Sequence, residues 1–178
     1  QELAFTEKED LLIMQPWQKL LEQMNRDTPL EELRLDSVAD LGFAVGAVTS
    51  DFSYIYSRAQ GKNKNFLTHR VMTFGSTLGW RELWRRGLGQ MLELELKLNP
   101  EQKTGKGRLH LPESLRSRIG ILLCQIENRQ EDIEKNADAF MCGFWAGYAM
   151  QRAKAIQDAQ ERQEKSSGDV EAIPNGNM

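Results

Sequence analysis

Residues 38–55 read VADLGFAVGAVTSDFSYI, and this apolar stretch decides the fold class of the chain. Its large apolar residues recur three and four positions apart, which is the spacing of one face of an α-helix; they are Val38, Leu41, Val45, Val48, Phe52 and Ile55. Gly42 and Gly46 lie beside this stripe, and small residues four apart let a second helix approach closely. The stretch predicts a buried helix of one domain, and a seam between two chains is the alternative.

A second stretch repeats this pattern near the other end of the chain. Residues 42–46 read GFAVG and residues 143–147 read GFWAG, and an Ala-Asp pair precedes each of them. Both stretches lie in apolar segments with helical spacing, so the two helices are expected to pack through their small faces. Two short matches are not enough to establish an internal repeat.

Other stretches predict further helices and their ends. Asp36 or Ser37 is expected to cap the helix over the opening stretch. Thr28 and Pro29 form a start signal for an earlier helix. The remaining helices are expected around the stripe Ile13, Trp17, Leu20 and Met24; over residues 66–86; after Pro112, with Leu115, Ile119, Leu122, Leu123 and Ile126 inward; and over residues 131–165. The aromatic core is expected to contain Phe52, Phe74, Trp84, Phe140, Phe144 and Trp145.

The predicted fold is therefore mainly α, a single helical domain of about five helices over residues 1–165. The Ser-, Gly-, Pro- and Asn-rich residues 166–178 predict a disordered tail. Residues 91–98 and 108–111 alternate apolar and polar side chains, which predicts one small β-hairpin over residues 91–111. The Leu, Glu and Lys residues of this region are helix formers and leave a helix as the alternative.

The composition indicates a cytoplasmic protein that does not enter a membrane. The longest uncharged apolar run, residues 139–150, is twelve residues long and too short to cross a bilayer. The sequence contains no Asn-x-Ser/Thr site, and its two cysteines, Cys124 and Cys142, both lie in apolar helical stretches. We expect both to be reduced core residues.

Motifs for catalysis, metal binding and cofactor binding are missing from the sequence. Neither His69 nor His110 has a second ligand at metal-site spacing, and no Gly-x-Ser-x-Gly, phosphate loop or dinucleotide-binding glycine motif occurs. We therefore predict no catalytic residue, no metal and no cofactor, and we expect that the protein is not an enzyme. A small enzyme with a site assembled from distant residues is a further, less favoured hypothesis.

Charge is divided along the chain. Residues 57–118 carry thirteen Lys and Arg against five Asp and Glu, whereas residues 1–56 carry four against eleven and residues 119–178 carry six against ten. A basic middle segment is typical of proteins that contact phosphate backbones. The candidate nucleic-acid-binding residues are Arg81, Arg85, Arg86, Lys103, Lys106 and Arg108. Pairing of the basic segment with the acidic flanks is the alternative explanation.

The leading hypothesis is a non-enzymatic accessory protein that binds nucleic acid through the basic middle segment, within a larger DNA- or RNA-processing assembly. The alternative is a helical protein–protein adaptor or regulator without nucleic-acid binding. It would use the exposed helix of residues 152–165 or the glycine-containing apolar face. Either hypothesis includes a protein partner or a homo-oligomer.

Overall fold

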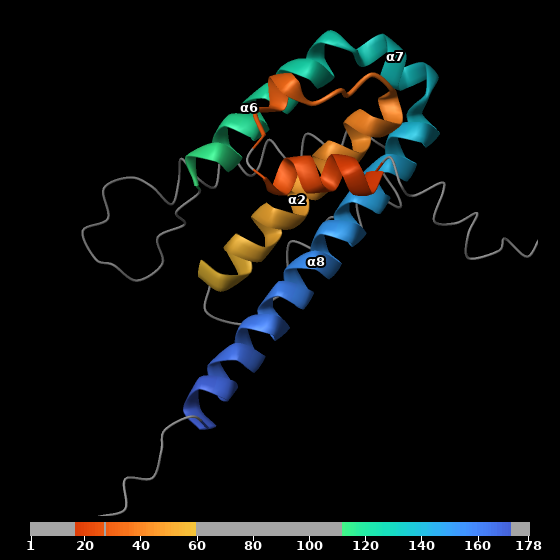
Figure 1. The fold of residues 1–178 in the computed structure, drawn as a ribbon. Helices are drawn as coiled ribbons and strands as arrows, with labels where there is room; N and C mark the ends of the chain where they lie inside the picture. Colours follow the sequence, from red (N-terminus) through yellow and green to blue (C-terminus); the bar gives the residue numbers. More distant parts are fainter. Residues whose placement is uncertain (1–16, 27, 60–111, 172–178) are drawn as a thin grey trace, which may run out of the picture.

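The computed structural model describes residues 17–26, 28–59 and 112–171 of the chain (Figure 1). These residues are mainly helical, as predicted, and the part of the chain that the structure describes contains no strand. The helix predicted over residues 66–86 and the hairpin predicted over residues 91–111 lie outside the described residues. So do Phe74 and Trp84 of the predicted core.

The opening stretch forms the helix α2, Val38–Ala59. Ser37 caps it, because the backbone N–H of Asp40 donates to the Ser37 Oγ over 3.0 Å. The predicted stripe faces inward: Val38, Leu41, Val45, Val48 and Phe52 are buried, and Ile55 is half-buried at the end of the core. The prediction of a buried helix is therefore confirmed.

The second glycine stretch lies in α8, Ala137–Glu171, and it packs directly on the first. A Cβ added to Gly42 or Gly46 would overlap the carbonyl oxygens of Phe140 and Phe144 on α8. A Cβ added to Gly143 or Gly147 would overlap the carbonyl oxygens of Ala39 and Phe43 on α2. The expected packing through small faces is confirmed, and the two backbones touch.

The two helices run parallel with a nearly symmetrical register. Gly42 contacts Phe140, which lies three residues before Gly143, and Gly143 contacts Ala39, which lies three residues before Gly42. One turn later the pattern repeats: Gly46 contacts Phe144, and Gly147 contacts Phe43. The contact thus has an approximate two-fold axis along the helices, and Figure 1 shows both helices descending side by side.

The helices α6, Glu113–Asn128, and α7, Gln130–Lys135, return the chain to the start of α8. The helix predicted after Pro112 is confirmed, with Leu115, Ile119, Leu122 and Ile126 buried and Leu123 half-buried. The single helix predicted over residues 131–165 is interrupted at Asn136, which has non-helical dihedral angles (φ −128°, ψ 38°). The Asn136 side chain donates to the Asp132 carbonyl over 3.0 Å and so satisfies an acceptor at the end of α7.

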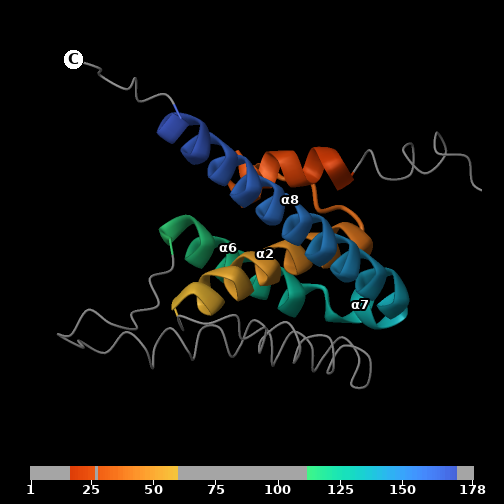
Figure 2. The ribbon, with the colours of Figure 1, turned by 90° about the horizontal axis from the view of Figure 1, so that it is seen from below.

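The N-terminal helix, residues 17–25, lies across α2 and α8 (Figure 2). The indole of Trp17 on this helix stacks on Phe43, with ring centroids 5.4 Å apart. Leu20 and Met24 of the same helix are buried. The start signal at Thr28 produces a single turn of 3-10 helix, η1, Leu30–Glu32, in place of a longer helix. Leu33 and Leu35, on either side of exposed Arg34, are then buried in an extended linker.

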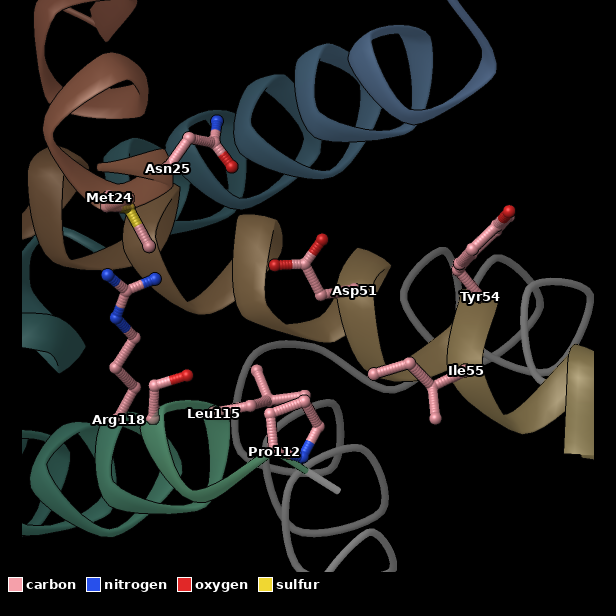
Figure 3. Close-up of a pocket in the computed structure, with 9 residues that line it drawn as sticks. Met24, Asn25, Asp51, Tyr54, Ile55, Pro112, Leu115 and Arg118 are labelled. Atoms are coloured by element: carbon pink, nitrogen blue, oxygen red, sulfur yellow. The ribbon is translucent and has the colours of Figure 1, made fainter. Parts of the chain in front are cut away.

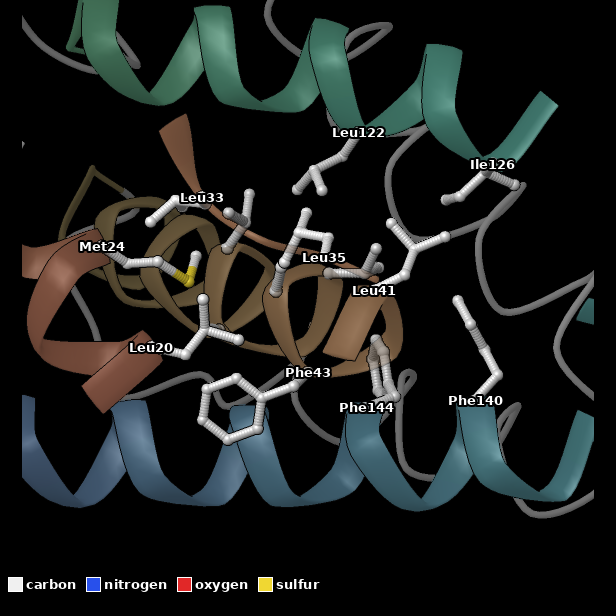
Figure 4. Packing of buried hydrophobic residues seen from close by; sticks show 14 of the residues in the cluster. Leu20, Met24, Leu33, Leu35, Leu41, Phe43, Leu122, Ile126, Phe140 and Phe144 are labelled. Atoms are coloured by element: carbon white, nitrogen blue, oxygen red, sulfur yellow. The ribbon is translucent and has the colours of Figure 1, made fainter. Parts of the chain in front are cut away.

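One hydrophobic core joins these elements. Figure 4 shows side chains from the N-terminal helix, the linker, α2, α6 and α8 converging on it. Phe52, Phe140 and Phe144 are buried as predicted, whereas Trp145 is only half-buried at the edge. Cys124 and Cys142 are free thiols, but both are exposed, so their prediction as core residues was wrong.

The C-terminal half of α8 extends beyond the rest of the described structure (Figure 1). The helix continues to Glu171, past the boundary at residue 166 that the composition of the tail had suggested. Residues 160–168 are exposed on every side of the helix, and residues 172–178 lie outside the described residues. The Lys154–Asp158 ion pair, 3.0 Å long, spans one turn where this projection begins.

The glycine contact makes a prediction about stability. Gly46→Ala and Gly143→Ala should each lower the free energy of unfolding by about 1–3 kcal/mol, because the added methyl group forces the backbones apart. Gly120→Ala is the matched control, since nothing lies within 4 Å of a Cβ at this exposed helical position. This control should gain up to about 1 kcal/mol from helix propensity. Urea unfolding followed by circular dichroism measures both, and equal effects at Gly46 and Gly120 would contradict the close contact.

The exposed cysteines make a second prediction. Cys124 and Cys142 should both react with Ellman's reagent in the native protein, at rates within about tenfold of those in denaturant, because reactivity follows access to the thiol. Single Cys→Ser variants assign each rate to its residue. Protection of either thiol until the protein unfolds would show that it is buried after all.

Candidate functional site

A pocket opens between the N-terminal helix, α2 and the beginning of α6. Its volume is about 230 Å³. It is lined by Met24 and Asn25 from the first of these elements; by Asp51, Tyr54 and Ile55 from α2; and by Pro112, Ser114, Leu115 and Arg118 from α6 and the residue before it. Figure 3 shows Asp51 extending from α2 and Arg118 rising from α6 toward Met24. The pocket thus has one acidic and one basic side chain among both apolar and uncharged polar neighbours.

A network of amide groups holds Asp51 in place. Gln151 of α8 is 7% exposed, and its Nε2 donates to the Asp51 Oδ1 over 2.6 Å and to the Asn25 Oδ1 over 3.0 Å. The Asn25 Nδ2 returns a hydrogen bond of 3.1 Å to the Gln151 Oε1. Because a carboxylate only accepts, the contact with Asp51 determines which way the Gln151 amide points. The network joins the N-terminal helix, α2 and α8 at one point.

Burial raises the pKa of Asp51 above its ordinary value of 3.8. The hydrogen bond from Gln151 and the positive charges of Arg118 and Lys154 oppose this effect but are smaller. The desolvation cost of a charged carboxylate in this position therefore exceeds the stabilisation that the neighbouring groups provide. Such a group is typical of binding sites, where a ligand supplies the missing compensation.

Arg118 approaches the pocket from α6 and acts on Asp51 without a direct ion pair. Its Nη2 donates to the backbone oxygen of Thr28 over 3.4 Å, which is a long hydrogen bond. Its side chain is half-buried, so the guanidinium is partly desolvated. Its charge nevertheless lowers the pKa of Asp51 through space.

The six residues predicted to bind nucleic acid are not part of this pocket. Arg81, Arg85, Arg86, Lys103, Lys106 and Arg108 all lie outside the described residues, as do His69 and His110. Of the basic middle segment, the described residues include Arg58, Arg116 and Arg118. The role of the six candidate residues in binding phosphate therefore stays a prediction.

Sequence analysis missed Asn25 and Asp51, which line the pocket, and Gln151, which holds Asp51 in place. Asp51 interrupts an otherwise uncharged run of α2 between Leu41 and Ser57, which is a signal that a charge lies near the core. Gln151 directly follows the apolar run that ends at Met150. Their pairing joins residues a hundred positions apart, and no local pattern points to it.

Within residues 17–26, 28–59 and 112–171, no group of His, Cys, Asp and Glu is placed to hold a metal ion. None of the helices in these ranges has the length and apolar character needed to span a membrane. No protein-family model, curated protein or solved structure matches the chain.

The raised pKa of Asp51 predicts how the stability of its variants depends on pH. Asp51→Asn keeps an oxygen for Gln151 and removes the buried charge. Wild type should lose stability relative to this variant as the pH rises from the ordinary value of 3.8 through the raised pKa, because the folded state then has to bury a carboxylate. The variant should thus be at least as stable as wild type at neutral pH.

Urea unfolding at several values between about pH 4 and pH 7 measures this difference. Glu164→Gln, at an exposed position of α8, is the control and should show no such trend. A wild type that gains stability over Asp51→Asn on going to neutral pH would reverse the sign and contradict the assignment.

Proposed function

We propose that the chain is a non-enzymatic accessory protein that binds nucleic acid through its basic middle segment, within a larger DNA- or RNA-processing assembly. The observation that carries the proposal is the division of charge. The described residues carry 17 Asp and Glu against 12 Lys and Arg, whereas residues 60–111 carry four against ten. An acidic scaffold repels phosphate, so attraction to a polyanion has to come from residues 60–111.

The arrangement of the scaffold supports this proposal. Ile55 near the end of α2 and Pro112 just before α6 line the same pocket. The chain therefore leaves α2 and enters α6 from neighbouring points, and the helical scaffold anchors the basic residues at both ends. Arg116 and Arg118 of α6 lie close to this anchor and extend the positive charge onto it.

The chemistry of the proposed contact is phosphate neutralisation. Arginine and lysine bind phosphate oxygens without regard to base sequence, and release of counterions makes such binding dependent on salt. The six candidate residues contain no pattern that reads base edges. The proposed role is thus to hold nucleic acid for other members of an assembly, and sequence recognition is left to them.

A second candidate, the protein–protein adaptor, draws support from α8. Residues 160–168 of this helix are exposed on every side, and Ile156, one turn before them, is a large apolar residue that is 50% exposed. The other surface considered for an adaptor, the glycine-containing face, is already occupied by the contact between α2 and α8. An adaptor would therefore use the projecting half of α8.

The test is fluorescence anisotropy with single- and double-stranded oligonucleotides at low salt. Four to six phosphate contacts would reduce the affinity on the order of a hundredfold between about 50 and 200 mM salt. Two triple variants, with Ala at residues 81, 85 and 86 or at residues 103, 106 and 108, should each weaken binding and flatten the salt dependence. The matched control replaces the exposed Arg152, Arg162 and Lys165 of α8 with Ala and should change little.

Two outcomes would overturn the proposal. One is the absence of binding at protein concentrations up to about 10⁻⁴ M, the weak end of nonspecific affinities. The other is an equal loss of affinity in the α8 control, which would show that net charge and not the middle segment is responsible. Either result would leave the adaptor as the better proposal.

A further inference from the structure

The pocket that contains Asp51 and Arg118 has opposite charges on two of its walls, and this points beyond nucleic-acid binding. We infer that it binds a small zwitterion of the amino-acid class, with the ammonium group of the ligand on Asp51 and its carboxylate on Arg118. The inference rests on the charges, hydrogen bonds and size of the pocket alone. It stands or falls independently of the proposed nucleic-acid role.

The acidic wall is ready to receive a cation. Gln151 donates to one oxygen of the Asp51 carboxylate, and the described residues bring no donor to the other oxygen. Burial also makes the unpaired charge costly. A ligand ammonium in contact with the second oxygen would compensate that charge, and charge-assisted hydrogen bonds of this kind are about twice as strong as neutral ones.

The basic wall is ready to receive an anion. A guanidinium has five N–H donors, and within the described ranges Arg118 uses one nitrogen for a long hydrogen bond of 3.4 Å to Thr28. The remaining donors can take both oxygens of a carboxylate at once, which is the geometry that arginine favours. Arg118 and Asp51 line the same pocket, so a ligand bound in it would face both charges.

The two charges together exclude simpler ligands. A plain cation would be attracted by Asp51 but repelled by Arg118, and a plain anion would meet the reverse. A molecule that carries both charges satisfies both walls and adds no net charge to a partly buried site. The two opposite charges of the pocket therefore favour zwitterions over amines, carboxylates and phosphates.

The size and the apolar wall narrow the class further. A volume of about 230 Å³ is below the roughly 300–1,000 Å³ of pockets for drug-sized ligands, so the ligand has to be small. Met24, Ile55 and Leu115 supply apolar surface to the pocket beside the charged groups. An amino acid with an aliphatic or thioether side chain matches this surface in size and character.

The test is isothermal titration calorimetry of the full chain with L-leucine and L-methionine as probes. 3-Methylbutylamine lacks the carboxylate of leucine, and 4-methylpentanoate lacks its ammonium group. Each of these single-charge analogues should bind about tenfold or more weakly than leucine, since each loses one charged hydrogen-bonding contact. The calorimetric signal for leucine should also be lost at low pH, when Asp51 is protonated.

Variants separate the two walls. Asp51→Asn should weaken leucine binding about tenfold and remove the advantage of leucine over 4-methylpentanoate. Arg118→Gln should likewise weaken it and remove the advantage over 3-methylbutylamine. Arg162→Gln and Glu164→Gln, at exposed positions of α8, are the matched charge controls and should bind leucine as wild type does. Circular dichroism checks that each variant is folded.

Two results would overturn the inference. The first is no binding of either amino acid up to about 10 mM, which exceeds the roughly 1 mM upper end of ordinary small-ligand affinities. The second is binding of leucine by folded Asp51→Asn or Arg118→Gln with wild-type affinity. The oligonucleotide assay uses none of these probes, so its outcome neither supports nor removes the inference.

Discussion

The structure depends on the direct backbone contact between α2 and α8. Four glycines are needed for it, because a Cβ at any of the four positions would lie within 2.9 Å of a backbone carbon of the other helix. At such separations Cα–H groups approach carbonyl oxygens, and these weak hydrogen bonds add to dispersion attraction. The interlocking also allows one register, so the contact determines which residues meet further along the two helices.

The hydrogen bond that holds Asp51 at the edge of the pocket is a consequence of that register. Gly42 and Gly46 are matched by Gly143 and Gly147, each 101 positions later, and the same offset continues down the helices. Gln151 lies 100 positions after Asp51, within one residue of that offset, and it meets Asp51 about one turn beyond the last glycine pair, where the amide donates over 2.6 Å. A shift of α8 by a single residue would turn Gln151 away and leave Asp51 buried without its donor. The geometry of the site therefore follows from the small residues above it.

Much of the described fold follows from local sequence patterns, and the failures have identifiable causes. The stripe of α2, its Ser37 cap and the paired glycine motifs are periodic or positional signals, and each is confirmed. The break at Asn136 was missed because one polar residue barely disturbs a helical pattern. Cys142 lies in an apolar run yet is exposed, because the run packs on α2 through one face and its composition does not reveal which face that is.

The candidate site was less predictable than the fold, because its residues come from four segments distant in sequence. The offset between the glycine motifs was nevertheless visible, and it places Arg152, the residue after Gln151, opposite Asp51. The pairing could thus have been inferred from two stretches that were already recognised as alike. The contribution of Arg118 could not have been inferred from the sequence, because it depends on how α6 packs against α2, and more than fifty residues separate the two helices.

The two proposed activities use different chemistry and different parts of the chain. The half-buried carboxylate of Asp51 repels phosphate, so the pocket is unsuited to be part of a surface for nucleic acid. Residues 60–111 have the opposite charge balance and no comparable excess of acids. Both regions are nevertheless anchored at the same place, where Ile55 and Pro112 line the pocket. A ligand in the pocket would contact Ile55 and Pro112, which flank the basic residues in sequence. Binding of the ligand would therefore stabilise the arrangement of the two ends between which the basic segment lies.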